Sequence, residues 1–181
     1  MKDHFEAVSH LLKGKQTSDP THHSGQGIFF TSKIADHFIL ESGKLRLVAD
    51  NTKGDTFLAD IRPIQGTRVH FDLRQRSKKS LKDLFDEFSN ADYQFDKTRV
   101  LVRLSAQHGQ YVSRSEAKRL LFGLEKFRRI ELDFKKIRGI GQGFADEIFR
   151  VFQSSHPKIK IQSLNTSKSV AFMIKRSLTA L

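Results

Sequence analysis

The spacing of hydrophobic residues divides the chain into two regions with different periods. Up to about residue 75, two segments with helical spacing precede a series of segments in which apolar and polar residues alternate, as they do in strands. From about residue 99, an alternating segment is followed by a helical one three times. The pattern therefore predicts an antiparallel α+β half-domain at residues 1–75 and a βαβαβα domain of the α/β class at residues 99–181.

Residues 1–75 combine two helical segments with four alternating ones. In the first helical segment, Phe5, Val8 and Leu11 share one face. Turn-forming residues separate the alternating segments, among them Ser42-Gly43 and Gln65-Gly66. Because strands joined by short turns usually pair with one another, we expect an antiparallel meander with one poorly covered apolar face. The expected helices are residues 5–12 and 27–37, and the expected strands are residues 38–41, 44–49, 56–61 and 68–73.

The second half of the chain alternates between strand and helix patterns. Expected strands begin at Arg99, Ile130 and Ile159, and each precedes an amphipathic helix. Ser113 and Glu116 have the spacing of a capping box, which marks the start of the first of these helices. Residues 76–98 are charged and contain a helical stripe of apolar residues, so we expect a linker helix there. The stripe consists of Leu81, Leu84, Phe85 and Phe88.

The positive charge of the chain is concentrated in its second half. The formal net charge is +12, and residues 99–181 contribute seventeen Lys and Arg against six Asp and Glu. Many of these cations fall between Arg114 and Arg138. Such a surface is either a solvated face or a contact for an anionic partner. An acidic protein and a nucleic acid are both open as that partner.

Composition limits the chemistry that the chain can perform. There is no cysteine, so disulfide bonds, thiolate metal sites and cysteine nucleophiles are excluded. His22 and His23 are adjacent and have no third ligand at a useful spacing, so we expect no metal site. We also expect no catalytic residues. The start of the chain lacks the apolar run of a signal peptide, and no run approaches membrane-spanning length, so we expect a cytoplasmic protein with no membrane partner.

Two glycine motifs in the first region indicate a phosphate-binding site. One runs from His23 to Thr31 and places two glycines before an apolar helix; the other is a Gly-Thr pair before an alternating strand. Glycines at a helix start let backbone N–H groups approach a phosphate. With the polar segment 13–23 ahead of them, the motifs resemble the lid, second glycine box and final strand of a histidine-kinase-like (GHKL) ATPase domain. The resemblance implies nucleotide contacts at Gly25, Gly27, Thr31, Gly66 and Thr67.

This resemblance covers only the C-terminal part of a GHKL domain. In that family an upstream helix supplies an Asn for magnesium and an acidic base, and an Asp-x-Gly-x-Gly segment holds adenine. Neither element lies in the 24 residues before Gly25. We therefore expect no cofactor for this chain alone, with ATP and Mg bound only if the missing half is supplied, and ATPase or kinase activity is disfavoured. We expect the chain to be truncated or encoded separately from that half, with an incomplete sheet that favours self-association.

The densest motif lies in the second region, at residues 130–152. A strand that ends at Phe134 is followed by the loop Gly139-Ile-Gly-Gln-Gly143 and an amphipathic helix. This segment resembles the switch segment of STAS domains, the fold of anti-sigma-factor antagonists. Gly141-Gln-Gly-Phe-Ala-Asp146, followed by Ile148-Phe149-Arg150, is similar to a bacterial and archaeal STAS-like family of unknown function that is often found C-terminal to a GHKL ATPase domain.

The STAS-like resemblance, over about residues 99–178, implies a partner-binding surface. Its expected residues are Arg138, Gly141, Gln142, Gly143 and Asp146. Anti-sigma antagonists carry a phosphorylatable Ser at this helix start, whereas Gln142 has no hydroxyl, so the phosphoryl switch does not carry over. We expect a prokaryotic signalling protein that acts through protein contacts. The alternatives are a nucleic-acid-binding module that uses residues 114–138, an ATP-binding kinase or ATPase completed by the missing half, and glycines that only close a tight strand–helix turn.

Overall fold

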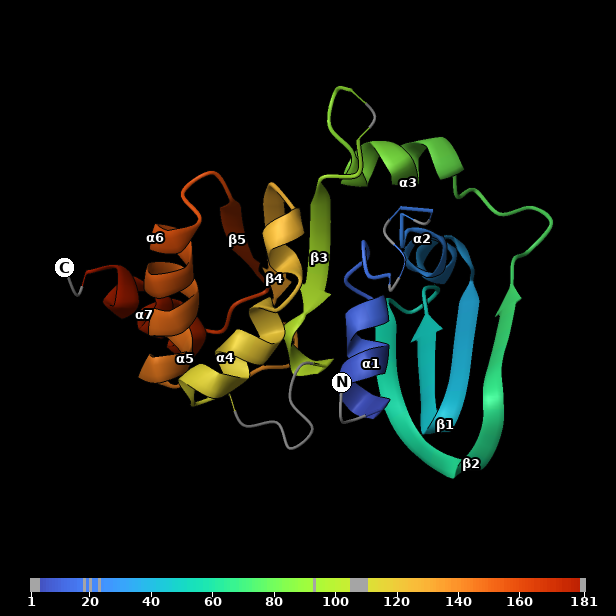
Figure 1. Ribbon diagram of the computed structural model, residues 1–181, viewed down its shortest axis with the longest axis horizontal. Coiled ribbons are helices and arrows are strands. Elements are labelled where there is room, and N and C mark those ends of the chain that lie inside the picture. Colours follow the sequence, from blue (N-terminus) through green and yellow to red (C-terminus); the bar gives the residue numbers. More distant parts are fainter. Residues whose placement is uncertain are drawn as a thin grey trace. The chain divides into compact units, whose positions relative to one another are not determined.

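The chain forms two compact units, residues 1–95 and 96–181, each with its own sheet (Figure 1). The computed structural model describes residues 4–17, 19, 21–22, 24–92, 94–104 and 111–179. The expected linker, residues 76–98, falls almost wholly within the first unit.

The first unit contains three helices and two long strands among its described residues. The two helices expected near its start are confirmed within a few residues, although the side chain of Phe5 lies outside the described part of the chain. The four expected strands are joined in pairs, because the chain continues as strand through Ser42-Gly43 and through Gln65-Gly66. The elements are α1 (His4–Leu11), α2 (Gly27–Ile34), β1 (His37–Asp50), β2 (Asp55–Asp72) and α3 (Leu81–Phe88).

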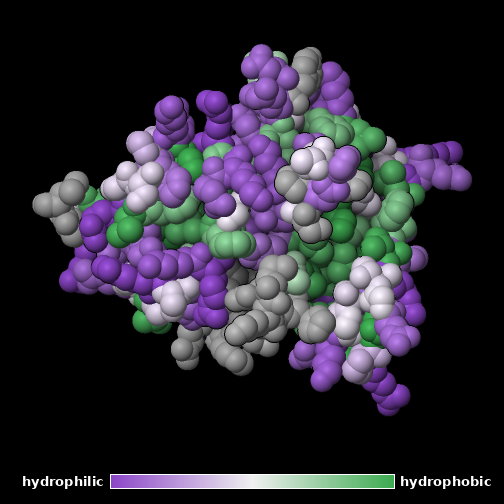
Figure 2. All heavy atoms as spheres, viewed as in Figure 1, coloured by the Kyte–Doolittle hydropathy of each residue, from purple (hydrophilic) through white to green (hydrophobic). Residues whose placement is uncertain are grey.

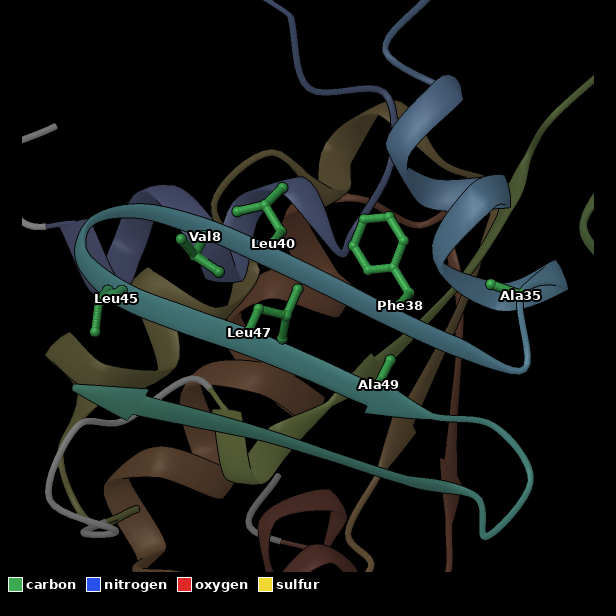
Figure 3. Packing of buried hydrophobic residues seen from close by; sticks show 7 residues of the cluster. All are labelled: Val8, Ala35, Phe38, Leu40, Leu45, Leu47 and Ala49. Carbon is green, nitrogen blue, oxygen red and sulfur yellow. The ribbon is translucent and has the colours of Figure 1, made fainter. Parts of the chain in front are cut away.

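The order of strands in the first unit differs from the expected meander. Residues 67–72 of β2 pair with residues 37–42 of β1, and residues 55–60 pair with residues 45–50. The fourth expected strand thus lies against the first instead of the third, and the predicted order is wrong. The reason lies at Gly43, which has a φ of 58° and begins a register shift. The two halves of β1 double back there, and β2 passes around them (Figures 1 and 3).

One face of this sheet forms a core with the first two helices. Leu40 and Leu47, from the two halves of β1, are almost fully buried and lie side by side with Phe38 and Ala49 (Figure 3). Helix α1 contributes Val8, and further apolar side chains of α1 and α2 pack around them. The expected burial of one apolar sheet face is confirmed for β1. The cluster consists of Val8, Ala35, Phe38, Leu40, Leu45, Leu47 and Ala49.

A carboxylate at the start of β1 ties the sheet to the segment that follows it. Asp36 is buried and accepts hydrogen bonds from the backbone N and the Nε of Arg74, both at 3.0 Å. Lys79 Nζ lies 3.3 Å from the same carboxylate. Hydrogen bonds from Arg74 hold the pKa of Asp36 well below its usual range. The chain after β2 is therefore positioned by charge-assisted bonds rather than by burial of its own side chains.

An aromatic cluster joins α2 to α3. The ring of Phe29 lies 5.0 Å from that of Phe88 and 4.8 Å from that of Phe95, and Phe30 stacks at 4.1 Å on Phe85. Lys33 Nζ lies 4.6 Å from the centre of the Phe29 ring, within cation–π range. The expected linker helix is thus packed on the first unit through Phe85 and Phe88 of its apolar stripe, whereas Leu81 is 55% exposed. The cluster consists of Phe29, Phe30, Phe85, Phe88 and Phe95.

The second unit confirms the predicted βαβαβα order. Its three strands are all parallel, in the order β3-β4-β5, with β4 in the centre. The helix after β4 is continuous from residue 142 to residue 155 and has a π-helical middle. The elements are β3 (Lys97–Leu101), η1 (Val102–Leu104), α4 (Arg114–Leu121), η2 (Leu124–Lys126), β4 (Arg129–Asp133), α5 (Gln142–Asp146), η3 (Glu147–Phe152), α6 (Gln153–Ser155), β5 (Lys160–Leu164) and α7 (Lys168–Leu178).

The two faces of the parallel sheet differ in chemistry. Ile130 and Leu132 of β4 are fully buried in the core beneath the helices, and α5 contacts both α4 and α7. Glu131, between them in sequence, points to the other face and pairs with Lys97 at 2.8 Å and with Arg99 at 2.7 Å. Parallel sheets are usually apolar on both faces. On this face the buried carboxylate of Glu131 instead pairs with two partly exposed cations.

Candidate protein-contact site

The glycine loop predicted to bind a partner lies between β4 and α5, and its backbone contacts a second segment. Gly141 N donates to the carbonyl of Tyr111 at 2.7 Å, and Phe144 N donates to the carbonyl of Val112 at 3.1 Å. These two backbone donors at the start of the helix are therefore satisfied by the chain that precedes α4, in place of an intrahelical partner.

Two glycines of the loop allow this approach. A Cβ at Gly141 would lie 2.7 Å from the Cα of Val112, and Cβ atoms in proteins do not approach other heavy atoms so closely. A Cβ at Gly143 would lie 3.3 Å from the Val112 carbonyl oxygen. Gly139 is different, because it is exposed and a Cβ there would meet only the Ser169 side chain, at 3.3 Å. Gly141 therefore has a packing role whatever the loop binds.

Asp146 is buried and links two helices through an ion-pair network. Its carboxylate accepts from Arg114 Nη2 at 2.6 Å, from Arg150 Nη2 at 2.8 Å and from Arg150 Nε. The hydrogen bonds from Arg150 lower the pKa of Asp146, and the charge of Arg114 lowers it further. Asp146 is therefore ionised at neutral pH and positions Arg114 at the start of α4.

The side chains that remain exposed around this loop form a small surface. Gln142 and Arg138 are exposed, and Val112 keeps 60% of its surface accessible. Arg114 lies beside Gly143 and is more than half exposed, although it pairs with Asp146. We call Val112, Arg114 and Gln142 the contact surface. Of the five predicted partner residues, only Gln142 belongs to it; Arg138 is exposed at the other end of the same turn, where its carbonyl accepts from Ser167 Oγ at 2.8 Å.

Sequence reasoning missed Val112 and Arg114 as members of this surface. Both flank Ser113, whose capping box is confirmed: Ser113 Oγ accepts from Glu116 N at 3.3 Å, and Glu116 Oε2 accepts from Ser113 N at 2.9 Å. An apolar residue just before a helix cap often packs against the helix it precedes. Val112 instead stays exposed. The capping box in the sequence therefore indicated that Val112 precedes the helix, but it did not indicate that its side chain is exposed.

A shallow groove lies between α4 and the π-helical segment. Its volume is about 240 Å³, and Phe122 at its edge is 63% exposed. Phe152 and His156 stack at 4.2 Å on the opposite side, and Lys118 faces Glu147 at 3.9 Å. The groove combines apolar walls with paired charges. Its lining is Lys118, Leu121, Phe122, Glu125, Glu147, Val151, Phe152, Ser155 and His156.

The basic region predicted at residues 114–138 is partly paired with acidic side chains. Arg114 and Lys118 face Asp146 and Glu147, so this end of the region carries a reduced local charge. Arg128 and Arg129, near the next strand, are exposed. The local pairing weakens the case for one continuous phosphate-binding surface, since such surfaces depend on unneutralised cations.

The residues predicted to contact a nucleotide lie in separate surroundings. Gly25 has a φ of 65°, and a Cβ there would lie 2.6 Å from Gln16 N; its carbonyl accepts from Lys15 N at 3.1 Å. Gly27 begins α2 beside open space, and Thr31 lies in the same helix. Thr67 Oγ1 lies 3.2 Å from Ser42 Oγ across the sheet, next to Gly66, whose φ is 75°. Their role in nucleotide binding stays a prediction.

Among the residues that the structure describes, no group of three or more His, Asp or Glu side chains is placed to hold a metal ion. His22 Nδ1 lies 2.9 Å from Asp19 Oδ2, while His23 lies outside the described residues. None of the described helices has the length and apolar character needed to cross a bilayer.

Comparison with known protein families finds a likeness within the second unit. Neither the curated proteins nor the solved structures contain a match to this chain. The GHKL resemblance of residues 1–75 stays a prediction, because the likeness that is found begins later in the chain. Residues 116–171, from α4 to α7, match the model of a STAS-like domain of unknown function (DUF4325).

Proposed function

We propose that this chain is a prokaryotic regulatory protein whose STAS-like second unit binds a protein partner through the contact surface. One observation carries the proposal. The side chain of Gln142 is exposed on a backbone that is fixed on both sides, by the Gly141–Tyr111 and Phe144–Val112 hydrogen bonds. A residue presented in this way loses little conformational freedom when it is bound.

The chemistry of the contact surface suits a protein partner. The Gln142 amide both donates and accepts hydrogen bonds, Val112 adds exposed apolar area, and Arg114 is oriented by its 2.6 Å bond to Asp146. Protein interfaces are enriched in such mixtures of apolar contact and oriented Arg. Gln142 has no hydroxyl to accept a phosphoryl group, so phosphorylation at this position does not control the proposed contact.

Coupling to ATP belongs to the proposal only for an assembled protein. The motifs around Gly25–Thr31 and Gly66-Thr67 support it by their resemblance to half of a GHKL site. For the chain alone we expect no useful ATP affinity, because phosphate contacts that face water contribute little. Calorimetric titration with Mg-ATP, compared between wild type and Gly27→Val, tests this part separately.

The proposal is tested by capture of cellular partners on immobilised protein, with nuclease-treated extract. Gln142→Ala is compared with Gln162→Ala, which removes another exposed amide in the same unit, on β5. Both variants are matched to wild type by circular dichroism and melting temperature. We expect Gln142→Ala to lose at least one protein that wild type and Gln162→Ala retain.

Identical partner sets for all three proteins would overturn the proposal. If untreated extract instead yields mainly nucleic acid from all three, and salt removes it steeply, the basic-module alternative is favoured. Surface substitutions of this kind usually change folding stability by less than about 0.5 kcal/mol, so a loss of capture reports on binding.

A further inference from the structure

The last part of β2 is an open sheet edge. Strand β2 has β1 as its neighbour in a two-stranded sheet, and residues 67–72 pair with residues 37–42 through one edge only. The backbone groups on the other edge of this segment have no strand beside them in the described part of the chain. An unpaired edge of this length is a template for another strand.

The apolar face of the sheet continues onto this edge without cover. Val69 is paired with Leu40, and Phe71 with Phe38, so each pair points to the same face. Leu40 and Phe38 are buried in the core, whereas Val69 and Phe71 are 47% and 57% exposed. Leu73, two residues further on, is 49% exposed. Hydrophobic side chains are visible at the surface over this sheet (Figure 2).

The other open part of β2 differs. In residues 55–60, the side chains on the core face are Thr56, Leu58 and Asp60, and of these only Leu58 is a large apolar residue that packs on the core. Phe57 is exposed but points to the opposite face, opposite Val48. Exposed apolar area on the core face is therefore concentrated at residues 69–73.

We propose that residues 68–72 of β2 pair with the same residues of a second copy of this chain, antiparallel about a two-fold axis at His70. In this register Val69 of one copy lies opposite Phe71 of the other, which brings their apolar side chains together. On the other face, Arg68 lies opposite Asp72 of the second copy. The arrangement is closed, because each edge meets its own equivalent.

Charge selects this register over its neighbours. Arg68 and Asp72 are both largely exposed and point to the same face of the sheet. A two-fold axis at His70 makes two Arg–Asp pairs, one on each side of the axis. An axis at Phe71 would instead place Arg68 opposite residue 74, which lies beyond the end of β2, and Asp72 opposite His70, so neither Arg–Asp pair would form. An axis at Val69 would place neither Arg68 nor Asp72 across from a residue of opposite formal charge.

The test uses sedimentation velocity on the full chain over a range of concentrations. Wild type is expected to be a dimer, and Val69→Lys a monomer with the far-ultraviolet circular dichroism of wild type, because Val69 is half exposed in the single chain. Phe57→Lys is the matched control, since it places the same charge on an exposed apolar position of the same strand. The proposal would be overturned if wild type stays monomeric at 100 times the lowest concentration studied, or if it associates without limit. It would also be overturned if Phe57→Lys loses the dimer and Val69→Lys keeps it.

The absence of cysteine allows the register to be tested directly. His70→Cys should give a disulfide-linked dimer on mild oxidation, because residue 70 lies opposite itself at the axis. Arg68→Cys is the control, since two copies of residue 68 are offset by four residues, about 13 Å along the strand. Equal cross-linking of the two variants, or preferential cross-linking through residue 68, would contradict the proposed register even if a dimer forms.

Discussion

Gly141 is the N-cap residue of α5, and the backbone of Val112 passes close to it. A Cβ at this position would lie 2.7 Å from the Val112 Cα and 2.8 Å from its carbonyl oxygen, both backbone atoms that cannot move alone. Gly141→Ala is therefore expected to lower the free energy of unfolding of the second unit by about 1–3 kcal/mol, as other overpacked substitutions do. Chemical denaturation followed by circular dichroism measures the change.

Gly139→Ala provides the matched control in the same loop. The new methyl group would meet only the Ser169 hydroxyl, which can rotate away, so the change in unfolding free energy should stay within about 0.5 kcal/mol. If both variants are equally stable, the close contact between Gly141 and Val112 does not exist in solution. The loop would then be an open turn.

Residue-level predictions from the sequence depended on how far apart the interacting residues are. The capping box of Ser113 and Glu116 is local, and it was predicted correctly from a spacing of three residues. The pairing of Asp146 with Arg114 joins residues 32 positions apart, so no spacing rule indicates it. Asp146 was predicted as a partner residue, yet its carboxylate is occupied by two arginines and only its effect on Arg114 reaches the surface.

At the level of elements, α3 belongs to the first unit because of its aromatic residues. Phe88 is 1% exposed, and its ring contacts that of Phe29 at 5.0 Å. Phe88→Ala would remove a fully buried ring from the cluster and leave a cavity, with an expected loss of about 3–5 kcal/mol of unfolding free energy. Amide hydrogen exchange of α2 and α3, compared between wild type and the variant, checks this result.

Phe85→Ala serves as the control on the same helix. Its ring stacks on Phe30 at 4.1 Å but is 39% exposed, so its loss should cost less than that of Phe88. A flexible linker helix would tolerate both substitutions equally. That outcome would show that α3 is not packed on α2.

The strands show why element boundaries and strand order were only partly predictable. Apolar alternation located all four strand segments, since the period of two depends only on which face is buried. The sequence predicts a turn at Gln65-Gly66, but the chain continues there as part of β2, and the register shifts near Gly43. A glycine inside a strand can mark a bend as well as a turn. Which strand lies beside residues 67–72 is decided by long-range packing that local sequence does not contain.

At the level of the whole molecule, the parallel sheet and the STAS-like likeness were predictable, whereas the extent of the partner surface was not. The glycine-rich helix start carried the family signal, and the matched residues 116–171 contain it. Exposure of Val112 depends on how the chain before α4 crosses α5, which is a tertiary contact. The concentration of positive charge in the second half was correct, but ion pairs such as Lys118 with Glu147 appear only in the folded chain.

The two units should differ in local stability, and amide hydrogen exchange measures this difference. Strand β4 has a neighbour on each side, and Leu132 and Phe134 are fully buried. Strand β2 has a neighbour on one side, and Phe57 is 45% exposed. Since exchange from a sheet requires local opening, amides of residues 57–61 should exchange at least about tenfold faster than those of residues 132–134. The measurement uses the Val69→Lys variant, so that pairing between copies cannot protect β2. Equal exchange in the two segments of a monomeric sample would mean that one-sided pairing does not weaken the first unit.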